Sequence, residues 1–182
     1  AAEAIDGVVM MIDDPNCTTD DLMTVIKGPD FPTGGVLIDT PELRAAYETG
    51  RGRVIMRARA EIEPGENHDK IVITEIPYGV NKAELIKQIA DLVNDKKIEG
   101  ISNANDESDR EGMRIVVDVK RDANANVVLN KLFKMTPLQT SFSVNCIALV
   151  KGRPKLLSLK DCISNFVNHR HDVVIRRTQY DL

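Results

Sequence analysis

The sequence predicts an α+β fold, a mostly antiparallel sheet of about four strands with helices packed on it and further helices at both ends. Several central stretches alternate apolar and polar residues with the period of two that is typical of half-buried strands. Between them lie stretches whose apolar residues recur every three to four positions, as in amphipathic helices. The resulting order of strand, strand, helix, strand, helix and strand favours a sheet with helices on one face.

The first 48 residues predict short helices and carry most of the negative charge, with ten acidic residues against two basic ones. Thr18 or Thr19 is suited to cap the second helix, and Gly50 stops the third. The breaker-rich loop at 28–35 separates this acidic part from the rest. The elements expected here are helices over 2–13, 18–26 and 41–48 and a strand over 36–38.

The remainder of the chain is mildly basic and predicts the main sheet. Residues 52–63 alternate strictly, and we expect them to form a hairpin with 70–76 across the turn at Pro64–Asn67. Asn81 is suited to cap the next helix, and residues 102–111 predict a polar acidic loop. The expected elements are strands over 52–63, 70–76, 113–120, 139–150 and 155–157 and helices over 82–96, 124–134 and 159–182.

Length and composition restrict the class of protein. The 182 residues suffice for one large domain or two small ones with a real core, and no apolar run is long enough for a membrane span. Three widely spaced cysteines, Cys17, Cys146 and Cys162, disfavour a disulfide framework or a zinc site and suit a reducing cytoplasm. The chain lacks an initiator Met and its last predicted helix has no stop signal, so we expect a piece of a longer protein.

No catalytic, metal or cofactor centre is expected. The sequence contains no glycine-rich phosphate loop between a strand and a helix. Its three histidines form no His-x-x-x-His pair, and the acidic group of 106–111 lacks the spacing of a calcium loop. A solvated acidic loop is the favoured interpretation of that group.

Three basic groups are the more informative feature. Arg53, Arg57 and Arg59 are expected on one face of a single strand, where either phosphates or the acids Glu61, Glu75 and Asp118 would neutralise them. Lys151, Arg153 and Lys155 flank a predicted hairpin turn. On the last helix, Arg170 and Arg177 share a face, beside His169, His171 and Arg176. Because no aromatic residues interleave with these groups, a duplex held by its backbone fits better than a stacked single strand.

Five stretches, in order along the chain, resemble the A subunits of the bacterial type IIA topoisomerases, DNA gyrase first and topoisomerase IV second. They are GPDFPTGG from residue 28, GRGRVIMRARAEIE from 50, IVITEIPYGVNKAELI from 71, EGISNANDESDREGMRIVVDVKRD from 99 and LQTSFSVNCIALVKGRPKLLSLKDCISNFVNHR from 138. The resemblance implies the end of a winged-helix domain at 1–27, a tower domain at 28–158 and the start of a coiled-coil arm at 159–182.

The resemblance also implies which roles this chain lacks. The family's catalytic tyrosine lies in an Arg-Tyr-Thr-Glu context, which Tyr47, Tyr78 and Tyr180 do not match. Mg²⁺ and ATP belong to the other component of the ATP-hydrolysing isomerase, so this chain is expected to need no cofactor and to be inactive alone. The implied partners are duplex DNA, two gyrase B subunits and a second gyrase A chain, which together form an A2B2 assembly, with no membrane.

The resemblance therefore implies a segment that binds and bends the flanks of the cleaved duplex during supercoiling. The expected phosphate contacts are Arg51, Arg53, Arg57, Arg59, Lys82, Lys151, Arg153, Arg170 and Arg177. The alternatives are a topoisomerase IV segment, a structural spacer whose arginines are used in intramolecular pairs, and an independent small-molecule enzyme of α+β fold.

Overall fold

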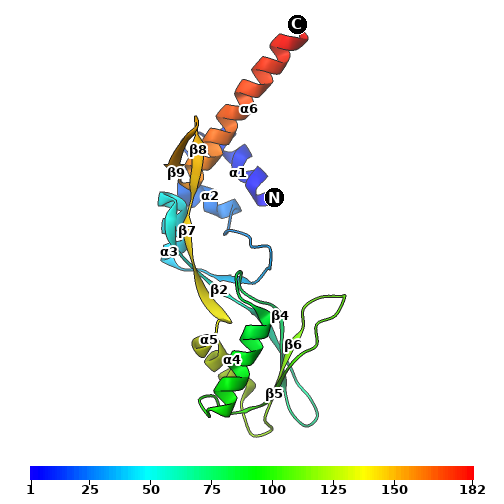
Figure 1. Ribbon diagram of the computed structural model, residues 1–182. Coiled ribbons are helices and arrows are strands. Elements are labelled where there is room, and N and C mark those ends of the chain that lie inside the picture. The colour runs from blue at the N-terminus through cyan, green and yellow to red at the C-terminus, as the bar shows by residue number, and fades with distance from the viewer. The chain divides into compact units, whose positions relative to one another are not determined.

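The computed structural model describes all residues, 1–182, and confirms the α+β fold with six helices and nine strands (Figure 1). The N-terminal elements are α1 (Ala2–Asp13), α2 (Thr19–Val25), β1 (Val36–Ile38) and α3 (Pro41–Thr49). They are followed by β2 (Arg51–Arg57), β3 (Arg59–Glu63), β4 (Lys70–Glu75), α4 (Lys82–Asn94), β5 (Ile101–Asp106), β6 (Ile115–Val119), α5 (Ala125–Met135), β7 (Gln139–Asn145), β8 (Ile147–Val150), β9 (Arg153–Leu156) and α6 (Leu159–Asp181). No helix combines the length and the apolar character needed to cross a bilayer.

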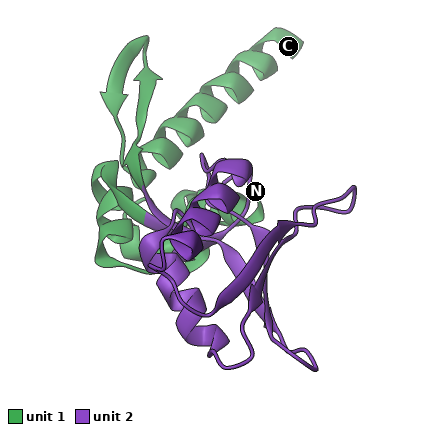
Figure 2. Cartoon of the chain, turned by 60° about the horizontal axis from the view of Figure 1, so that its bottom comes forward, with its two compact units in different colours: residues 1–29, 39–54, 142–182 green, residues 30–38, 55–141 purple.

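The chain divides into two compact units (Figure 2). Unit 1 comprises residues 1–29, 39–54 and 142–182, and unit 2 comprises residues 30–38 and 55–141. Each unit has its own cluster of buried apolar side chains. Strands β2 and β7 each begin in one unit and end in the other.

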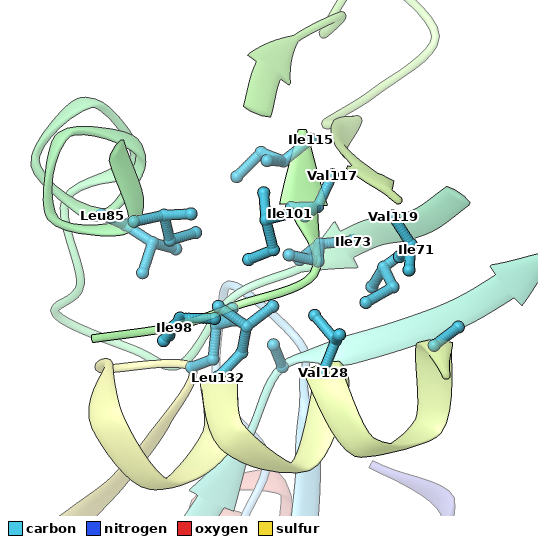
Figure 3. Close-up of a cluster of buried hydrophobic side chains, with 14 of the residues drawn as sticks. Ile71, Ile73, Leu85, Ile98, Ile101, Ile115, Val117, Val119, Val128 and Leu132 are labelled. Carbon is cyan, nitrogen blue, oxygen red and sulfur yellow. The ribbon is translucent and has the colours of Figure 1, made fainter. Parts of the chain in front are cut away.

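Unit 2 is built on a four-stranded antiparallel sheet of order β3-β4-β6-β5. Alternation within β4 and β6 places Ile71, Ile73 and Val117 on one face, where they are fully buried. Leu85 of α4 and Leu132 of α5 complete this core, and Figure 3 shows the side chains of the two helices pointing toward those of the sheet. Helix α4 begins where predicted and α5 one residue later, at Ala125; the side chains of Asn81 and Asn124 cap them by accepting hydrogen bonds from first-turn amides.

Unit 1 packs α1, α2 and α3 against the first turns of α6. Its core consists of Met11, Cys17, Leu22, Ile26 and Ile163. Thr18 and Ser158 start α2 and α6 with complete capping boxes, in which the cap and the third helical residue exchange hydrogen bonds. Both predicted helix starts are thereby confirmed.

The predicted single strand over 52–63 is wrong. Ala58 interrupts it, because the Ala58 amide donates to the carbonyl oxygen of Leu138 at 2.8 Å. β2 joins a three-stranded sheet of order β1-β2-β7, whereas β3 joins the four-stranded sheet. Only 59–63 therefore forms the expected hairpin with β4. The alternating pattern continues through Ala58, which is buried like its apolar neighbours, so the period of two carries no sign of the change of sheet.

Two further predictions need correction. Part of the predicted loop at 102–111 is strand β5, which pairs along the edge of β6. The predicted strand over 139–150 is divided at Cys146, whose amide donates to the Gly50 carbonyl while its own carbonyl accepts from Leu157. The remaining differences concern element ends, such as 115–119 for β6, Asn94 as the last residue of α4 and 153–156 for β9.

Candidate nucleic-acid interface

The nine cations expected to contact phosphate are distributed over both units. Unit 2 contains three of them, Arg57, Arg59 and Lys82, and each has a partner within the chain. Unit 1 contains the other six, Arg51, Arg53, Lys151, Arg153, Arg170 and Arg177, and none of their side chains is engaged in a hydrogen bond or an ion pair.

Arg59 forms an ion pair on the edge of the four-stranded sheet. Its Nε lies 3.2 Å from Oε2 of Glu75, the residue paired with it across β3 and β4. The same carboxylate oxygen accepts the Gly35 amide hydrogen at 2.6 Å. The Gly35 bond first, and Arg59 second, hold the pKa of Glu75 below its ordinary value. Glu75 thus neutralises Arg59, which agrees with the interpretation that acids of the chain, rather than phosphates, pair with this arginine.

Arg57 has neutral partners. Its Nε donates to Oε1 of Gln139 at 2.6 Å, and its guanidinium carbon lies 4.9 Å from the centre of the Phe133 ring. These contacts fix the half-buried side chain through hydrogen bonding and a cation–π interaction. Because Arg53 and Arg57 belong to β2 and Arg59 to β3, the expected single strip of three arginines is wrong.

Lys82 forms an ion pair with the acidic group of 106–111. Its Nζ lies 2.7 Å from Oδ2 of Asp106, and this contact, followed by hydrogen bonds from Ser108, lowers the pKa of Asp106 to about 2. Glu107 in turn lies 3.3 Å from Arg114. Two of the loop's acids therefore have cationic partners. Nowhere in the chain do three or more His, Cys, Asp or Glu side chains gather as a metal site.

The outer face of the four-stranded sheet carries both acids and cations, and its cations have acidic neighbours, such as Glu63 beside Arg114. Glu63 and Asp118 lie on either side of Lys70 in the register of β3, β4 and β6. Asp118, an expected partner of the arginines, instead lies 3.4 Å from Nε2 of His68. This face therefore offers no strip of cations to a phosphate backbone.

The six predicted cations of unit 1 are exposed and unpaired. Arg51 and Arg53 open β2, and their side chains extend into solvent. Lys151 and Gly152 form the two-residue turn between β8 and β9. Their φ angles are 50° and 77°, and a tight hairpin turn of this kind requires positive φ at both positions. Arg153 and Lys155 follow on β9. From residue 123 to 160 the chain contains no acidic residue, so the hairpin cations have no acid close in sequence to neutralise them.

On α6, Arg170 and Arg177 are exposed and lie seven residues apart, two turns along one face as expected. His169, His171 and Arg176 are also exposed.

A further cationic group was not recognised from the sequence. Lys96, Lys120 and Lys131 line a cavity of about 540 Å³ in unit 2, together with the acids Glu99 and Asp122. Lys96 follows α4, Lys120 follows β6 and Lys131 lies on α5. Only the fold therefore brings these lysines together. No local motif marks such a group.

The whole chain, residues 1–182, matches the family of the DNA gyrase/topoisomerase IV A subunits. The chain therefore belongs to this family, as the resemblance indicated.

Its similar relatives are DNA gyrase A subunits. It is 54% identical over 181 residues to the DNA gyrase A subunit of Clostridium acetobutylicum, covering 99% of this chain and 22% of that protein. It is 54% identical to the corresponding gyrase chain of Staphylococcus epidermidis and 52% identical to that of Halalkalibacterium halodurans, covering 99% of this chain in both cases and 20% and 22% of those proteins. The chain thus spans about a fifth of the length of these curated relatives.

Proposed function

We propose that the chain is the part of a gyrase A subunit that holds duplex DNA beside the site of cleavage, through its phosphate backbone. One observation carries the proposal: the six predicted cations of unit 1 lack intramolecular partners, whereas the three of unit 2 have them. An unpaired exposed cation gains most from a phosphate, because binding releases condensed counterions without breaking an existing contact. The contacts fall on the backbone, so they position the duplex without reading its sequence.

In this proposal the chain has no catalytic residue and supplies binding and bending to the strand-breaking enzyme. Residues 1–27, 28–158 and 159–182 correspond to the end of a winged-helix domain, the tower and the start of the coiled-coil arm. The complete assembly is cytoplasmic and pairs two A subunits with two B subunits, which use Mg²⁺ and ATP. The similarity to the gyrase subunits of three bacteria supports this placement.

The salt dependence of duplex binding tests the proposal. The affinity of the chain for a linear duplex is measured by fluorescence anisotropy over a series of salt concentrations. The double variant Lys151→Gln/Arg153→Gln is expected to flatten the slope of log affinity against log salt by about two units, since each phosphate contact contributes about 0.9.

The matched control is Arg59→Gln/Lys82→Gln, which removes the same charge from side chains that already have carboxylate partners. We expect its slope to equal that of the unmodified chain. Equal slopes for both double variants would contradict the assignment of the hairpin cations.

The competing function is a structural spacer. It is favoured by the partners of Arg57, Arg59 and Lys82, because these three cations of unit 2 are used within the chain. A spacer has no affinity for duplex beyond that of a protein of equal charge, so salt-independent or undetectable binding by the unmodified chain would support it.

A further inference from the structure

Cys146 lies at the base of the β8–β9 hairpin, opposite a buried leucine. In the register of the hairpin, Ile147 pairs with Leu156. The next pair along is Cys146 and Leu157, and the Leu157 amide donates to the Cys146 carbonyl at 2.9 Å. Residues directly opposite each other in an antiparallel pair extend their side chains to the same face. Cys146 and Leu157, which is 4% exposed, therefore share one face of the ribbon.

Cys162 approaches the same leucine from the first turn of α6. Ser158 is the N-cap of this helix, so Leu157 directly precedes the cap. Cys162 is the fourth helical residue, and its amide donates to the Ser158 carbonyl at 3.0 Å. At helix starts with a capping box, as in α6, the side chains at these two positions pack on each other. Cys146 and Cys162 thus flank Leu157, although they are sixteen positions apart in the sequence.

The electrostatics of Cys162 agree with this placement. Burial first, and then the negative charges of the nearby Cys146 and Asp161, raise the pKa of Cys162 above its ordinary value of 9.0. Both of these cysteines are free thiols with exposed surface. Cys17, in contrast, is 2% exposed, and its thiol donates to the sulfur of Met11 at 3.5 Å. The chain therefore has one neighbouring pair of accessible thiols and one isolated, buried thiol.

We propose that Cys146 and Cys162 form a redox-sensitive pair, a dithiol that closes to an intramolecular disulfide when a low-molecular-weight disulfide is the oxidant. The Cys146 thiolate attacks one sulfur of that disulfide and expels a thiolate, which leaves a mixed disulfide on Cys146. The Cys162 thiolate then attacks the Cys146 sulfur and expels the second thiolate. Two electrons pass from the protein thiols to the oxidant, and their two protons pass through solvent to the two thiols released.

The environments of the two thiols set this order of attack. The raised pKa of Cys162 reduces its thiolate fraction, so the first, bimolecular step falls to Cys146. The second step is intramolecular, because the fold already holds Cys162 near the mixed disulfide. In a reducing compartment such a pair stays a dithiol and closes only when the oxidant accumulates.

The disulfide would act on the segment that carries two of the unpaired cations. Cys146 also donates its amide to the Gly50 carbonyl at 2.8 Å, so it is already fixed at the start of β2. Closure would join this residue covalently to the first turn of α6. It would thereby hold the base of the hairpin that carries Lys151 and Arg153.

The test uses the folded, DNA-free chain and glutathione disulfide. The chain is equilibrated with mixtures of glutathione and glutathione disulfide, quenched with acid, unfolded and alkylated, and its peptides are analysed by mass spectrometry. We expect Cys146 and Cys162 to escape alkylation together and to be recovered as one cross-linked pair, whereas Cys17 is alkylated. The effective concentration of the two thiols, obtained from the mixture that cross-links half of the chain, should fall at least about tenfold in urea, which removes the folded placement.

Variants assign the two sulfurs. Cys146→Ser and Cys162→Ser are expected to form no cross-link and to leave the remaining cysteine of the pair as a mixed disulfide with glutathione. The matched control, Cys17→Ala, removes the isolated thiol and is expected to cross-link like the unmodified chain.

Any of three outcomes would overturn the inference. The first is a folded chain that carries glutathione on both Cys146 and Cys162 without a cross-link between them. The second is an equal effective concentration in the folded and the urea-unfolded chain. The third is a cross-link that joins two chains instead of closing within one. These outcomes concern the chain without DNA and leave the proposed duplex contacts unaffected.

Discussion

Replacing Glu75 by Ala is expected to release the loop before β1 from the four-stranded sheet. The Glu75 carboxylate holds this loop through the Gly35 amide at 2.6 Å and binds Arg59 at 3.2 Å. Gly34, the preceding residue, has a φ of 71°, a conformation that glycine adopts without steric cost. A single side chain therefore joins β4, β3 and the glycine turn.

The size of the effect follows from the two contacts. A hydrogen bond to a charged group contributes about 1.5–3 kcal/mol, and the partly exposed position of Glu75 places this one at the lower end. The ion pair with Arg59, whose side chain is half exposed, adds less than about 1 kcal/mol. We therefore expect Glu75→Ala to lower the free energy of unfolding of unit 2 by about 2 kcal/mol.

Urea unfolding and hydrogen exchange of the Gly35 amide measure this prediction. Exchange at Gly35 is expected to accelerate at least about tenfold in Glu75→Ala, because its acceptor is lost. Glu61→Ala, on the exposed face of β3 and without a partner, is the control and is expected to change stability by less than about 0.5 kcal/mol. Equal stability and equal Gly35 protection in Glu75→Ala and the unmodified chain would refute this reasoning.

The same carboxylate predicts a dependence on pH. Its pKa in the folded chain lies below the ordinary value of 4.5, chiefly because of the Gly35 hydrogen bond. Its stabilising contribution is therefore complete above pH 4.5 and is lost as the pH falls through the lower, folded-state pKa. The difference in stability between the unmodified chain and Glu75→Gln should shrink over that acidic range, and a difference that grows on acidification would contradict the assignment.

Three other predictions concern stability and ionisation. Gly50→Ala is expected to lower the free energy of unfolding of unit 1 by at least about 2 kcal/mol, because Gly50 has a φ of 79° and its added Cβ would meet the backbone carbonyl of Leu157; urea unfolding measures it. Leu22→Ala, at the fully buried centre of unit 1, should cost about 2–5 kcal/mol in the same assay, and a cost below about 1 kcal/mol would contradict the described core. Lys82→Gln is expected to raise the pKa of Asp106 from about 2 toward its ordinary 3.8, which a carboxyl carbon NMR titration measures; an unchanged pKa would show that Lys82 is not its main partner.

Much of the fold was predictable because local signals define it. The helix starts at Thr18, Asn81, Asn124 and Ser158 follow from cap chemistry that acts within three residues. The hairpin at Lys151–Gly152 follows in the same way from turn residues and flanking apolar positions. The breaks in the strands were not predictable, because the hydrogen bonds that cause them, from Ala58 to Leu138 and from Cys146 to Gly50, connect residues about 80 to 100 positions apart.

The candidate site shows the same limit. Strand β5 has the polar sequence Ser-Asn-Ala-Asn-Asp after Ile101, and as an edge strand it needs only Ala104 and Ile101 to face the core. Its composition therefore resembles that of a loop. Arg57 likewise resembles a free cation in sequence, because Gln139 and Phe133 approach it only in the folded chain. The unpaired state of Lys151 and Arg153, in contrast, is consistent with a local feature of the sequence, which has no acidic residue from 123 to 160.

Lysine footprinting of the DNA complex tests the central claim most directly, namely that the unpaired cations of unit 1 contact the duplex. The chain is acetylated with and without a saturating linear duplex, and the modification rate at each lysine is determined by mass spectrometry. We predict that DNA slows acetylation at Lys151 and Lys155 and leaves Lys82, which is paired with Asp106, unchanged. Protection of Lys82 with unaltered rates at Lys151 and Lys155 would contradict the account.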